Sequence, residues 1–214
     1  RSSALASKAT GFPIALISAM LAAGLNLDEI PCGKYGTLDK YVPDGDYLVI
    51  KYARWAFEKF KGAEDKLGTQ MKAVGEVMSI GKSYKEALQK AIRSLEIGRY
   101  GLGNAKDFAS RTKEELLDML HVVSSERQFI MYEALRKGAT VEELYNLTKI
   151  KPYFIEQMKE LLEEEETLKT YEGTIPPTEI LLKAKQNGFS DKYLSQLLKV
   201  SESSIRRARY EAGI

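Results

Sequence analysis

The sequence has few of the residues that most often build reactive or cross-linked sites. Its 214 residues include one cysteine, one histidine and one tryptophan. Because Cys32 is the only cysteine, no disulfide framework can form within the chain, and His121 has no cysteine or histidine partner at metal-ligand spacing. These absences exclude a disulfide-stabilised scaffold and a cysteine–histidine zinc site, and we expect a reducing, cytoplasmic setting.

Long apolar runs and an excess of either charge are also missing. No apolar stretch reaches the roughly 20 residues that cross a bilayer. The 32 basic residues nearly balance the 30 acidic ones, so the net charge of +2 gives no overall reason to expect a nucleic-acid or membrane partner. A hydrophobic content of 44% predicts a soluble globular protein of one domain or two small ones.

Sequence motifs that carry chemistry are absent as well. The chain has no phosphate-binding glycine loop, no nucleophile elbow and no recognisable pair of catalytic carboxylates. We interpret His121, on an apolar helix, as a residue at the edge of the core, because a general base needs partners that the sequence does not show. We therefore expect no complete active site, no bound cofactor and no bound metal in this chain alone.

The stretch at 71–81, MKAVGEVMSIG, joins a short β-rich part to a long helical part. Along it, mostly small or polar residues alternate with larger ones, which is the period-2 pattern of a strand with two different faces. Gly75 would allow either a packed helix or a ligand to approach the backbone closely, and we favour the helix. A second strand is predicted at 46–52, and the two would form an antiparallel pair.

The N-terminal 24 residues predict two short helices, separated by the Gly-Phe-Pro sequence at 11–13. In the second helix, Ile14, Ile17 and Leu21 recur at helical spacing and continue to Leu25, which predicts a buried face. A loop rich in glycine, proline and aspartate follows at 26–45.

Helices are predicted from Ser83 to the end of the chain. Capping boxes begin three of them, at Ser83 with Glu86, at 112–115 and at 140–143, and Pro152 opens the longest. The segment 99–110 has several small residues and no period, which marks a domain boundary. In the longest helix, we interpret the four glutamates at 163–166 as a solvated face, because adjacent helical positions point in different directions.

One helical pair resembles a binding motif. Within 190–210, a short helix, a turn and a second helix carrying Arg206, Arg207 and Arg209 resemble a helix-turn-helix. Arginines at these positions could contact phosphates or guanine edges. A helical nucleic-acid-binding protein is therefore the alternative hypothesis, although short helix pairs are common packing units and the balanced charge opposes it.

Five segments are distinctive: residues 1–15 (RSSALASKATGFPIA), 75–81 (GEVMSIG), 134–138 (ALRKG), 147–150 (LTKI) and 188–191 (GFSD). Together they resemble one family, the large subunit of carbamoyl-phosphate synthetase, an ATP-grasp ligase. These segments occur in the right order over nearly the whole chain, and the first is specific to the first of the two similar synthetase halves.

The resemblance implies a fold class and a domain order. It implies a mainly α chain with a small α+β N-terminal part: residues 1–100 would be the C-terminal portion of the carboxyphosphate ATP-grasp domain, with helices and a short antiparallel strand pair. Residues 101–111 would be a linker, and residues 112–214 an all-helical oligomerisation domain. Since the chain begins at Arg1, without methionine, we expect it to be a fragment of a longer protein.

The resemblance also implies a function for the parent protein. The parent would make carbamoyl phosphate from bicarbonate, glutamine-derived ammonia and two ATP, with magnesium or manganese, for arginine and pyrimidine biosynthesis. Its partners would be the remainder of the large chain, further copies and a glutaminase small subunit, with no nucleic acid and no membrane. The family's metal ligands precede the position of Arg1, so the fragment would provide oligomerisation and structural support and be inactive alone.

Two arginines are the candidate catalytic residues. By resemblance, Arg1 belongs to the loop that faces the phosphate and bicarbonate end of the site, where a permanent cation would stabilise the transferring phosphoryl group. Arg54 follows the strand predicted at 46–52 and would point toward the same end, with a surface salt bridge as the alternative. Removing the neighbouring strands of a larger sheet would leave an edge open to pairing, so we also expect self-association.

Overall fold

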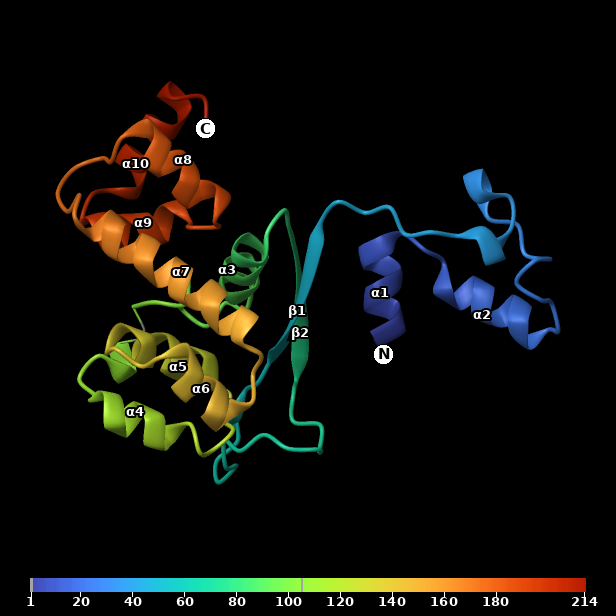
Figure 1. Ribbon diagram of the computed structural model, residues 1–214, viewed down its shortest axis with the longest axis horizontal. Helices are drawn as coiled ribbons and strands as arrows, with labels where there is room; N and C mark the ends of the chain where they lie inside the picture. The colour runs from blue at the N-terminus through green and yellow to red at the C-terminus, as the bar shows by residue number, and fades with distance from the viewer. Residues whose placement is uncertain (1, 105) are drawn as a thin grey trace. The chain divides into compact units, whose positions relative to one another are not determined.

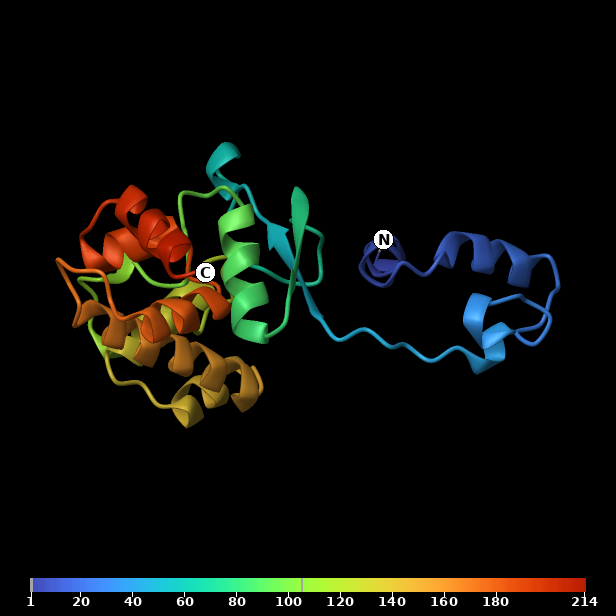
Figure 2. The same cartoon turned by 90° about the horizontal axis from the view of Figure 1, so that it is seen from above.

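The computed structural model describes residues 2–104 and 106–214 (Figures 1 and 2). The chain forms two compact units, one up to Val49 and one over Ile50–Ile214. The described residues make ten α-helices and a two-stranded antiparallel sheet, so the predicted mainly α class is confirmed. None of the described helices combines the length and the apolar character needed to span a bilayer.

The first unit contains the two predicted short helices, α1 (Ser2–Thr10) and α2 (Ile14–Ala22). Gly11 separates them with a positive φ of 71°, which glycine adopts without strain. Short 3-10 turns follow at Gly33–Tyr35 and Leu38–Lys40. The predicted buried face of α2 is wrong, because no residue of that helix is buried within the described chain and Leu21 stays 41% exposed.

The two strands are β1 (Leu48–Arg54) and β2 (Gly75–Gly81), so the predicted pair is present with shifted ends. Alternation along the strands gives the sheet two different faces. Tyr52 and Ser79 are buried on one face, whereas Ile80 is 45% exposed on the other. On that exposed face Lys51 pairs with Glu76 at 2.7 Å.

The glycine that admits a helix against the sheet is Gly81, not Gly75 as predicted. A Cβ on Gly81 would lie 2.8 Å from the Ala87 backbone nitrogen of α3 (Tyr84–Ser94), which leaves no room for a side chain. At Gly75 the nearest atom is the Arg54 Cβ at 4.0 Å, an ordinary contact. The close approach falls at the C-terminal end of β2 because α3 begins three residues later and folds back on the strand.

The start of α3 departs from the predicted capping box in one bond. The Ser83 hydroxyl accepts a hydrogen bond from the Glu86 backbone N–H at 3.2 Å, as predicted. The Glu86 carboxylate, however, accepts from the Lys82 N–H at 2.7 Å instead of from the Ser83 N–H. The predicted boxes at Thr112 with Glu115 and Thr140 with Glu143 are both complete.

The remaining helices confirm the predicted helical half. They are α4 (Lys113–Met119), α5 (Arg127–Arg136), α6 (Val141–Thr148), α7 (Pro152–Lys169), α8 (Thr178–Gln186), α9 (Asp191–Leu198) and α10 (Glu202–Glu211). Two 3-10 turns, Phe57–Lys59 and Lys106–Phe108, lie in the loops. In Figure 1, α4, α5 and α6 gather at one end of α7, and α8, α9 and α10 at the other.

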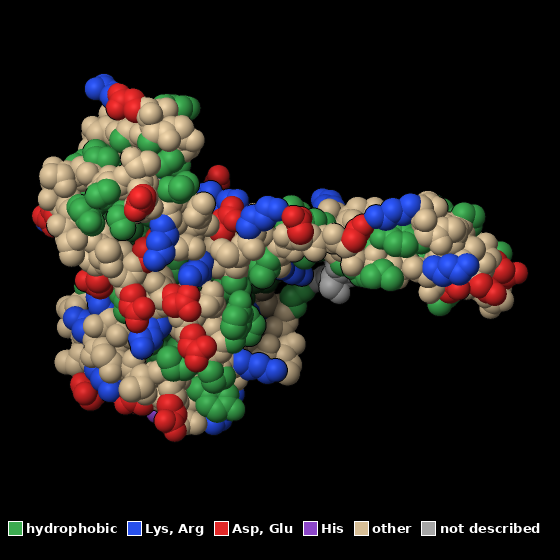
Figure 3. All heavy atoms as spheres, turned by 45° about the horizontal axis from the view of Figure 1, so that its top comes forward, with side chains coloured by type: hydrophobic (Ala, Val, Ile, Leu, Met, Phe, Trp, Pro, Cys, Tyr) green, Lys and Arg blue, Asp and Glu red, His purple; other side chains and the backbone are tan. Residues whose placement is uncertain are grey.

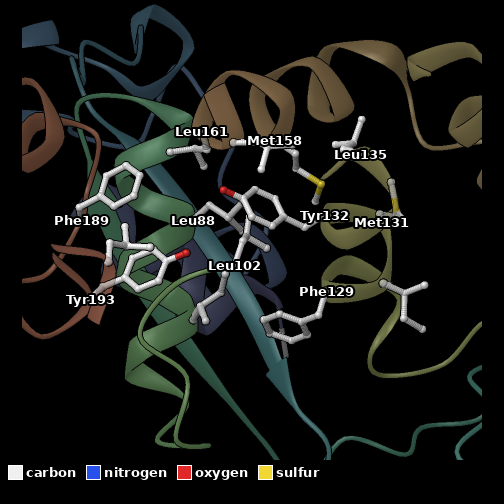
Figure 4. Close-up of a cluster of buried hydrophobic side chains, with 14 of the residues drawn as sticks. Leu88, Leu102, Phe129, Met131, Tyr132, Leu135, Met158, Leu161, Phe189 and Tyr193 are labelled. Atoms are coloured by element: carbon white, nitrogen blue, oxygen red, sulfur yellow. The ribbon is translucent and has the colours of Figure 1, made fainter. Parts of the chain in front are cut away.

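A single hydrophobic core runs through the second unit (Figure 4). Leu88 of α3, Tyr132 of α5, Met158 of α7 and Tyr193 of α9 all contribute to it. The predicted linker at 101–111 lies inside this unit, and its Leu102 and Phe108 are buried in the same core. The loop therefore packs with the helices of this unit.

Candidate functional site

A cavity of about 390 Å³ lies where the end of β1 meets the loops before α4 and α5. Its walls combine aromatic rings with groups of both charges. Aromatic rings come from Tyr52, Trp55, Phe57 and Phe129, and charged or polar groups from Arg54, Asp65, Arg99, Ser125 and Glu126. This is the hollow at which the described candidate arginine lies.

Arg54, the last residue of β1, lines this cavity. Its guanidinium donates a hydrogen bond to the backbone carbonyl of Trp55, which holds the side chain close to its own chain. The strand therefore ends with a cation at the cavity. Arg1, the other candidate, lies outside the described residues, so the structure does not bring the two arginines together.

Arg99 is the second arginine of the cavity, and no sequence motif points to it. Its guanidinium carbon lies 3.8 Å from the centroid of the Phe129 ring, a cation–π arrangement. Its Nη2 is 2.6 Å from Glu126 Oε2, and its buried Nη1 has no hydrogen-bond partner among the described residues. One donor on this wall is thus left without an acceptor.

Burial raises the pKa of Glu126, and the charge of Arg99 opposes this rise without cancelling it. The attraction of Arg99 therefore offsets only part of the unfavourable effect of burial on the charged carboxylate. A neighbouring carboxylate, Asp65, accepts hydrogen bonds from the backbone N–H of Ser125 at 2.9 Å and from its hydroxyl at 2.6 Å. Asp65 fixes the turn that precedes α5 and so positions Glu126.

The side chains that line this cavity are suited to binding a ligand more than to catalysing a reaction. Arginine and aromatic side chains form a site for a planar or anionic group, since the guanidinium has a rigid fork of donors. Among the described residues no cluster of histidine, cysteine or carboxylate side chains could hold a metal ion. The hydroxyl–carboxylate pair in the cavity lining, Ser125 with Asp65, fixes the turn before α5.

A buried carboxylate network is the feature that sequence reasoning missed. Glu165 of α7, assigned to a solvated face, is 0% exposed. Its Oε2 accepts hydrogen bonds from the hydroxyls of Tyr132 at 2.8 Å and Tyr193 at 2.7 Å. Its Oε1 accepts from Arg136 at 2.7 Å and lies 3.0 Å from Lys169 Nζ. The prediction was wrong for this glutamate because helical geometry turns it toward the core.

The charges around Glu165 outweigh the effect of its burial. Burial raises the pKa of a carboxyl group, but Arg136, Lys169 and the two tyrosine hydroxyls lower the pKa of Glu165 below its usual value. The carboxylate is consequently ionised at neutral pH and joins three helices, α5, α7 and α9.

The glycines of the 101–111 loop allow this network to close. A Cβ on Gly103 would lie 2.1 Å from the Tyr193 hydroxyl oxygen and 2.3 Å from Glu165 Oε2. At Gly101 it would lie 2.6 Å from Tyr193 and from the Gln89 side chain. A larger residue at either position would overlap the buried polar centre, so both positions require glycine.

The sequence did contain a signal for Glu165. Met158, Leu161, Glu165 and Leu168 follow one another at spacings of three and four, the period of one helical face. The glutamate therefore occupies a core position in a run whose other three acidic residues do not.

The helix pair α9 and α10 provides little support for the nucleic-acid alternative. Arg209 forms a bidentate pair with Asp191, with the closest nitrogen–oxygen distance 2.6 Å, so it holds the two helices together. Arg206 and Arg207 are exposed. On the face drawn in Figure 3, basic side chains alternate with acidic ones and form no continuous basic surface.

Comparison with known proteins gives consistent matches. The family model of the carbamoyl-phosphate synthetase large chain, oligomerisation domain, matches residues 76–213. The carbamoyl phosphate synthase large chain of Archaeoglobus fulgidus is 50% identical over 219 residues, which cover 100% of this chain and 20% of the relative. The corresponding protein of Pseudomonas putida is 46% identical, with the same coverage of both chains.

A third relative is itself a section of a large chain. The "Carbamoyl phosphate synthase large chain, N-terminal section" of Methanopyrus kandleri is 44% identical over 227 residues, covering 100% of this chain and 40% of the relative. The present chain thus spans about a fifth of the length of the Archaeoglobus and Pseudomonas relatives. With the family model matching well over half of its residues, the chain belongs to the carbamoyl-phosphate synthetase large chain family.

Proposed function

We propose that this chain provides the oligomerisation and structural part of a carbamoyl-phosphate synthetase large chain. The observation that carries the proposal is that the family match at 76–213 lies entirely within the compact unit Ile50–Ile214. Within that unit α3, α5, α7 and α9 share one core, so the matched segment has the packing of a folded module. Self-association and contact with the remainder of the large chain are its proposed interactions.

The parent protein, in this proposal, makes carbamoyl phosphate from bicarbonate, glutamine-derived ammonia and two ATP, for arginine and pyrimidine biosynthesis in the cytoplasm. ATP with magnesium or manganese and a glutaminase small subunit belong to the parent. The proposed division places the end of an ATP-grasp domain within residues 1–100 and the oligomerisation domain within 112–214. The names of the relatives support the parent's identity, and the remaining steps follow from the family resemblance.

The proposal predicts that the isolated chain does not turn over ATP. Bicarbonate-dependent ATP hydrolysis should be at the level of buffer, because no metal-binding cluster is formed by the described residues. Light scattering on the same sample should give a mass above that of one chain. Hydrolysis comparable to an intact synthetase would contradict the structural role, and a monomer at the highest concentration would contradict the associating one.

A catalytic contribution of Arg54 is a separate part of the proposal. Its position at the end of β1, beside a 390 Å³ cavity, supports a role in facing a phosphate group. In the intact large chain, Arg54→Ala should reduce bicarbonate-dependent ATP hydrolysis at least tenfold, since a permanent cation stabilises the transferring phosphoryl group. Lys51→Ala, on the exposed face of the same strand, is the matched control. Equal loss in both variants would refute a specific role for Arg54.

A further inference from the structure

The loop between β1 and β2 is long for a connection between two paired strands. It covers residues 55–74, and its regular structure among the described residues is the short 3-10 turn Phe57–Lys59. Loops of this length are uncommon in compact proteins and are often functional. In Figure 1 the loop lies at the lower end of the sheet, beside the chain that joins α4 to α5.

Both ends of this loop are bonded to Arg54. The Arg54 guanidinium donates a hydrogen bond to the carbonyl of Trp55, the first residue of the loop. The N–H of Val74, the last residue of the loop, donates to the Arg54 carbonyl at 2.9 Å. A shift of the loop would therefore move the Arg54 side chain relative to the cavity.

The middle of the loop is held by the helical module, residues 112–214. Asp65 accepts hydrogen bonds from the backbone N–H of Ser125 at 2.9 Å and from its hydroxyl at 2.6 Å, one at each carboxylate oxygen. Two residues further on, the Leu67 N–H donates to the Val123 carbonyl at 2.6 Å. Because hydrogen bonds to an ionised carboxylate are stronger than those between neutral groups, Asp65 contributes most to this attachment.

The 390 Å³ cavity lies across this attachment. Arg54 and Trp55 line it from the end of β1 and the start of the loop, and Glu126 lines it from the start of α5. Asp65 and Ser125, which bond to each other, are both part of the lining. Breaking this pair would therefore release the loop side of the cavity and, with it, the position of Arg54.

We infer that Asp65 is a positioning residue, which holds the β1–β2 loop against the helical module and so fixes Arg54 at the cavity. The helical module then has a role besides association, because it sets the geometry at the end of β1. The inference rests on the catalytic contribution proposed for Arg54 and names the residue through which that arginine is placed.

Trp55 reports on the loop, because it is the one tryptophan in the sequence and lies half-buried at the cavity. In the full chain, Asp65→Ala should raise the Stern–Volmer constant for acrylamide quenching of its fluorescence at least twofold, since both bonds to Ser125 are lost. Asp65→Asn keeps an acceptor oxygen and should raise the constant less. Glu64→Ala removes the same charge from the neighbouring, exposed residue and should leave it unchanged. Circular dichroism checks that each variant remains helical.

Kinetics of the intact large chain test whether Asp65 acts through Arg54. Asp65→Ala should lower kcat for bicarbonate-dependent ATP hydrolysis at least fivefold and leave KM for ATP within about twofold, because Arg54 is proposed to act on the transferring phosphoryl group. Added to Arg54→Ala, it should cause no further loss, since a positioning residue has no effect once the residue it places is gone. Asp65→Asn should recover most of the activity.

The outcomes separate this inference from the proposed function. Unchanged quenching in Asp65→Ala, full activity of that variant, or a double variant in which the two losses multiply would overturn the inference and leave the proposed role of Arg54 in place. Full activity of Arg54→Ala would overturn both.

Discussion

Two carboxylates of the helical unit, the buried Glu165 and the half-buried Glu126, have similar neighbours but opposite shifts in pKa. Each lies beside an arginine that contacts an aromatic ring, Arg136 on Tyr132 and Arg99 on Phe129. Glu165 is held by two tyrosine hydroxyls, Arg136 and Lys169, and its pKa is lowered. Glu126 pairs with Arg99, and its pKa is raised.

The difference distinguishes a structural centre whose hydrogen bonds are all made from a site that keeps an unsatisfied hydrogen-bond donor. A buried charge stabilises a fold only where hydrogen bonds satisfy it fully, and an incompletely satisfied one carries a desolvation cost. The Glu165 network meets that condition and joins three helices. The cavity beside Arg99 does not, because a guanidinium nitrogen there remains without a partner among the described residues. We therefore assign a stabilising role to the first region and propose a binding role for the second.

Breaking the complete network should give the largest effect. Glu165→Gln should lower the free energy of unfolding by about 2–4 kcal/mol, because Arg136 and Lys169 lose their shared anion in a buried place. Urea denaturation followed by circular dichroism measures the loss. Glu163→Gln, at an exposed position of α7 where the carboxylate pairs with Lys159 at 3.8 Å, is the control and should cost under about 0.5 kcal/mol. Equal effects would mean that Glu165 is not a special centre.

Adding a methyl group at Gly103, which packs against the Glu165 network, should have the next largest effect on the free energy of unfolding. Gly103→Ala should cost about 1–3 kcal/mol, because its Cβ would overlap the Tyr193 hydroxyl and the Glu165 carboxylate. Gly75→Ala meets only an ordinary contact at 4.0 Å and should change the unfolding free energy by less than about 0.5 kcal/mol. A tolerated Gly103→Ala would show that the 101–111 loop can move off the network.

Neutralising the incomplete pair should matter least. Glu126→Gln should change the free energy of unfolding at pH 7 by less than about 1 kcal/mol, because the raised pKa means that burial already opposes the charge. The same urea experiment at the same pH gives the comparison with Glu165→Gln. A loss as large as that of Glu165→Gln would remove the distinction between the two regions.

Glu165 and Glu126 should make the stability depend on pH in opposite directions. The lowered pKa of Glu165 contributes stability that is complete above the unfolded value of about 4.3 and is lost as pH falls through the folded pKa. The raised pKa of Glu126 acts above about 4.3, where its contribution falls as pH rises. Glu165→Gln should thus flatten the stability profile below pH 4.3, and Glu126→Gln should flatten the fall above it. Unfolding measured from pH 3 to 7 separates the two windows.

Local signals in the sequence predicted the helical half well. The capping boxes at Thr112 and Thr140 form because neighbouring residues supply both partners, so three or four positions contain all the information. The strands and the break at Gly11 follow from equally short patterns. For the same reason the family resemblance, which depends on contiguous motifs, could be recognised from the sequence.

Features that depend on distant partners could not be predicted. Glu165 is buried because Tyr132 and Tyr193 reach it from 33 and 28 residues away. Arg99 is held in the cavity wall by Phe129 and Glu126, and no residue near it in the sequence indicates these contacts. Gly101 and Gly103 fit against side chains from α3, α7 and α9, all of them distant in the sequence.

Sedimentation equilibrium of the full chain tests the central claim, an associating structural module, most directly. Over a wide concentration range at physiological salt, the weight-average mass should rise from that of one chain toward twice that value. A fitted self-association equilibrium would match the role proposed for the family's oligomerisation domain. A mass that remains that of one chain at the highest concentration would contradict it.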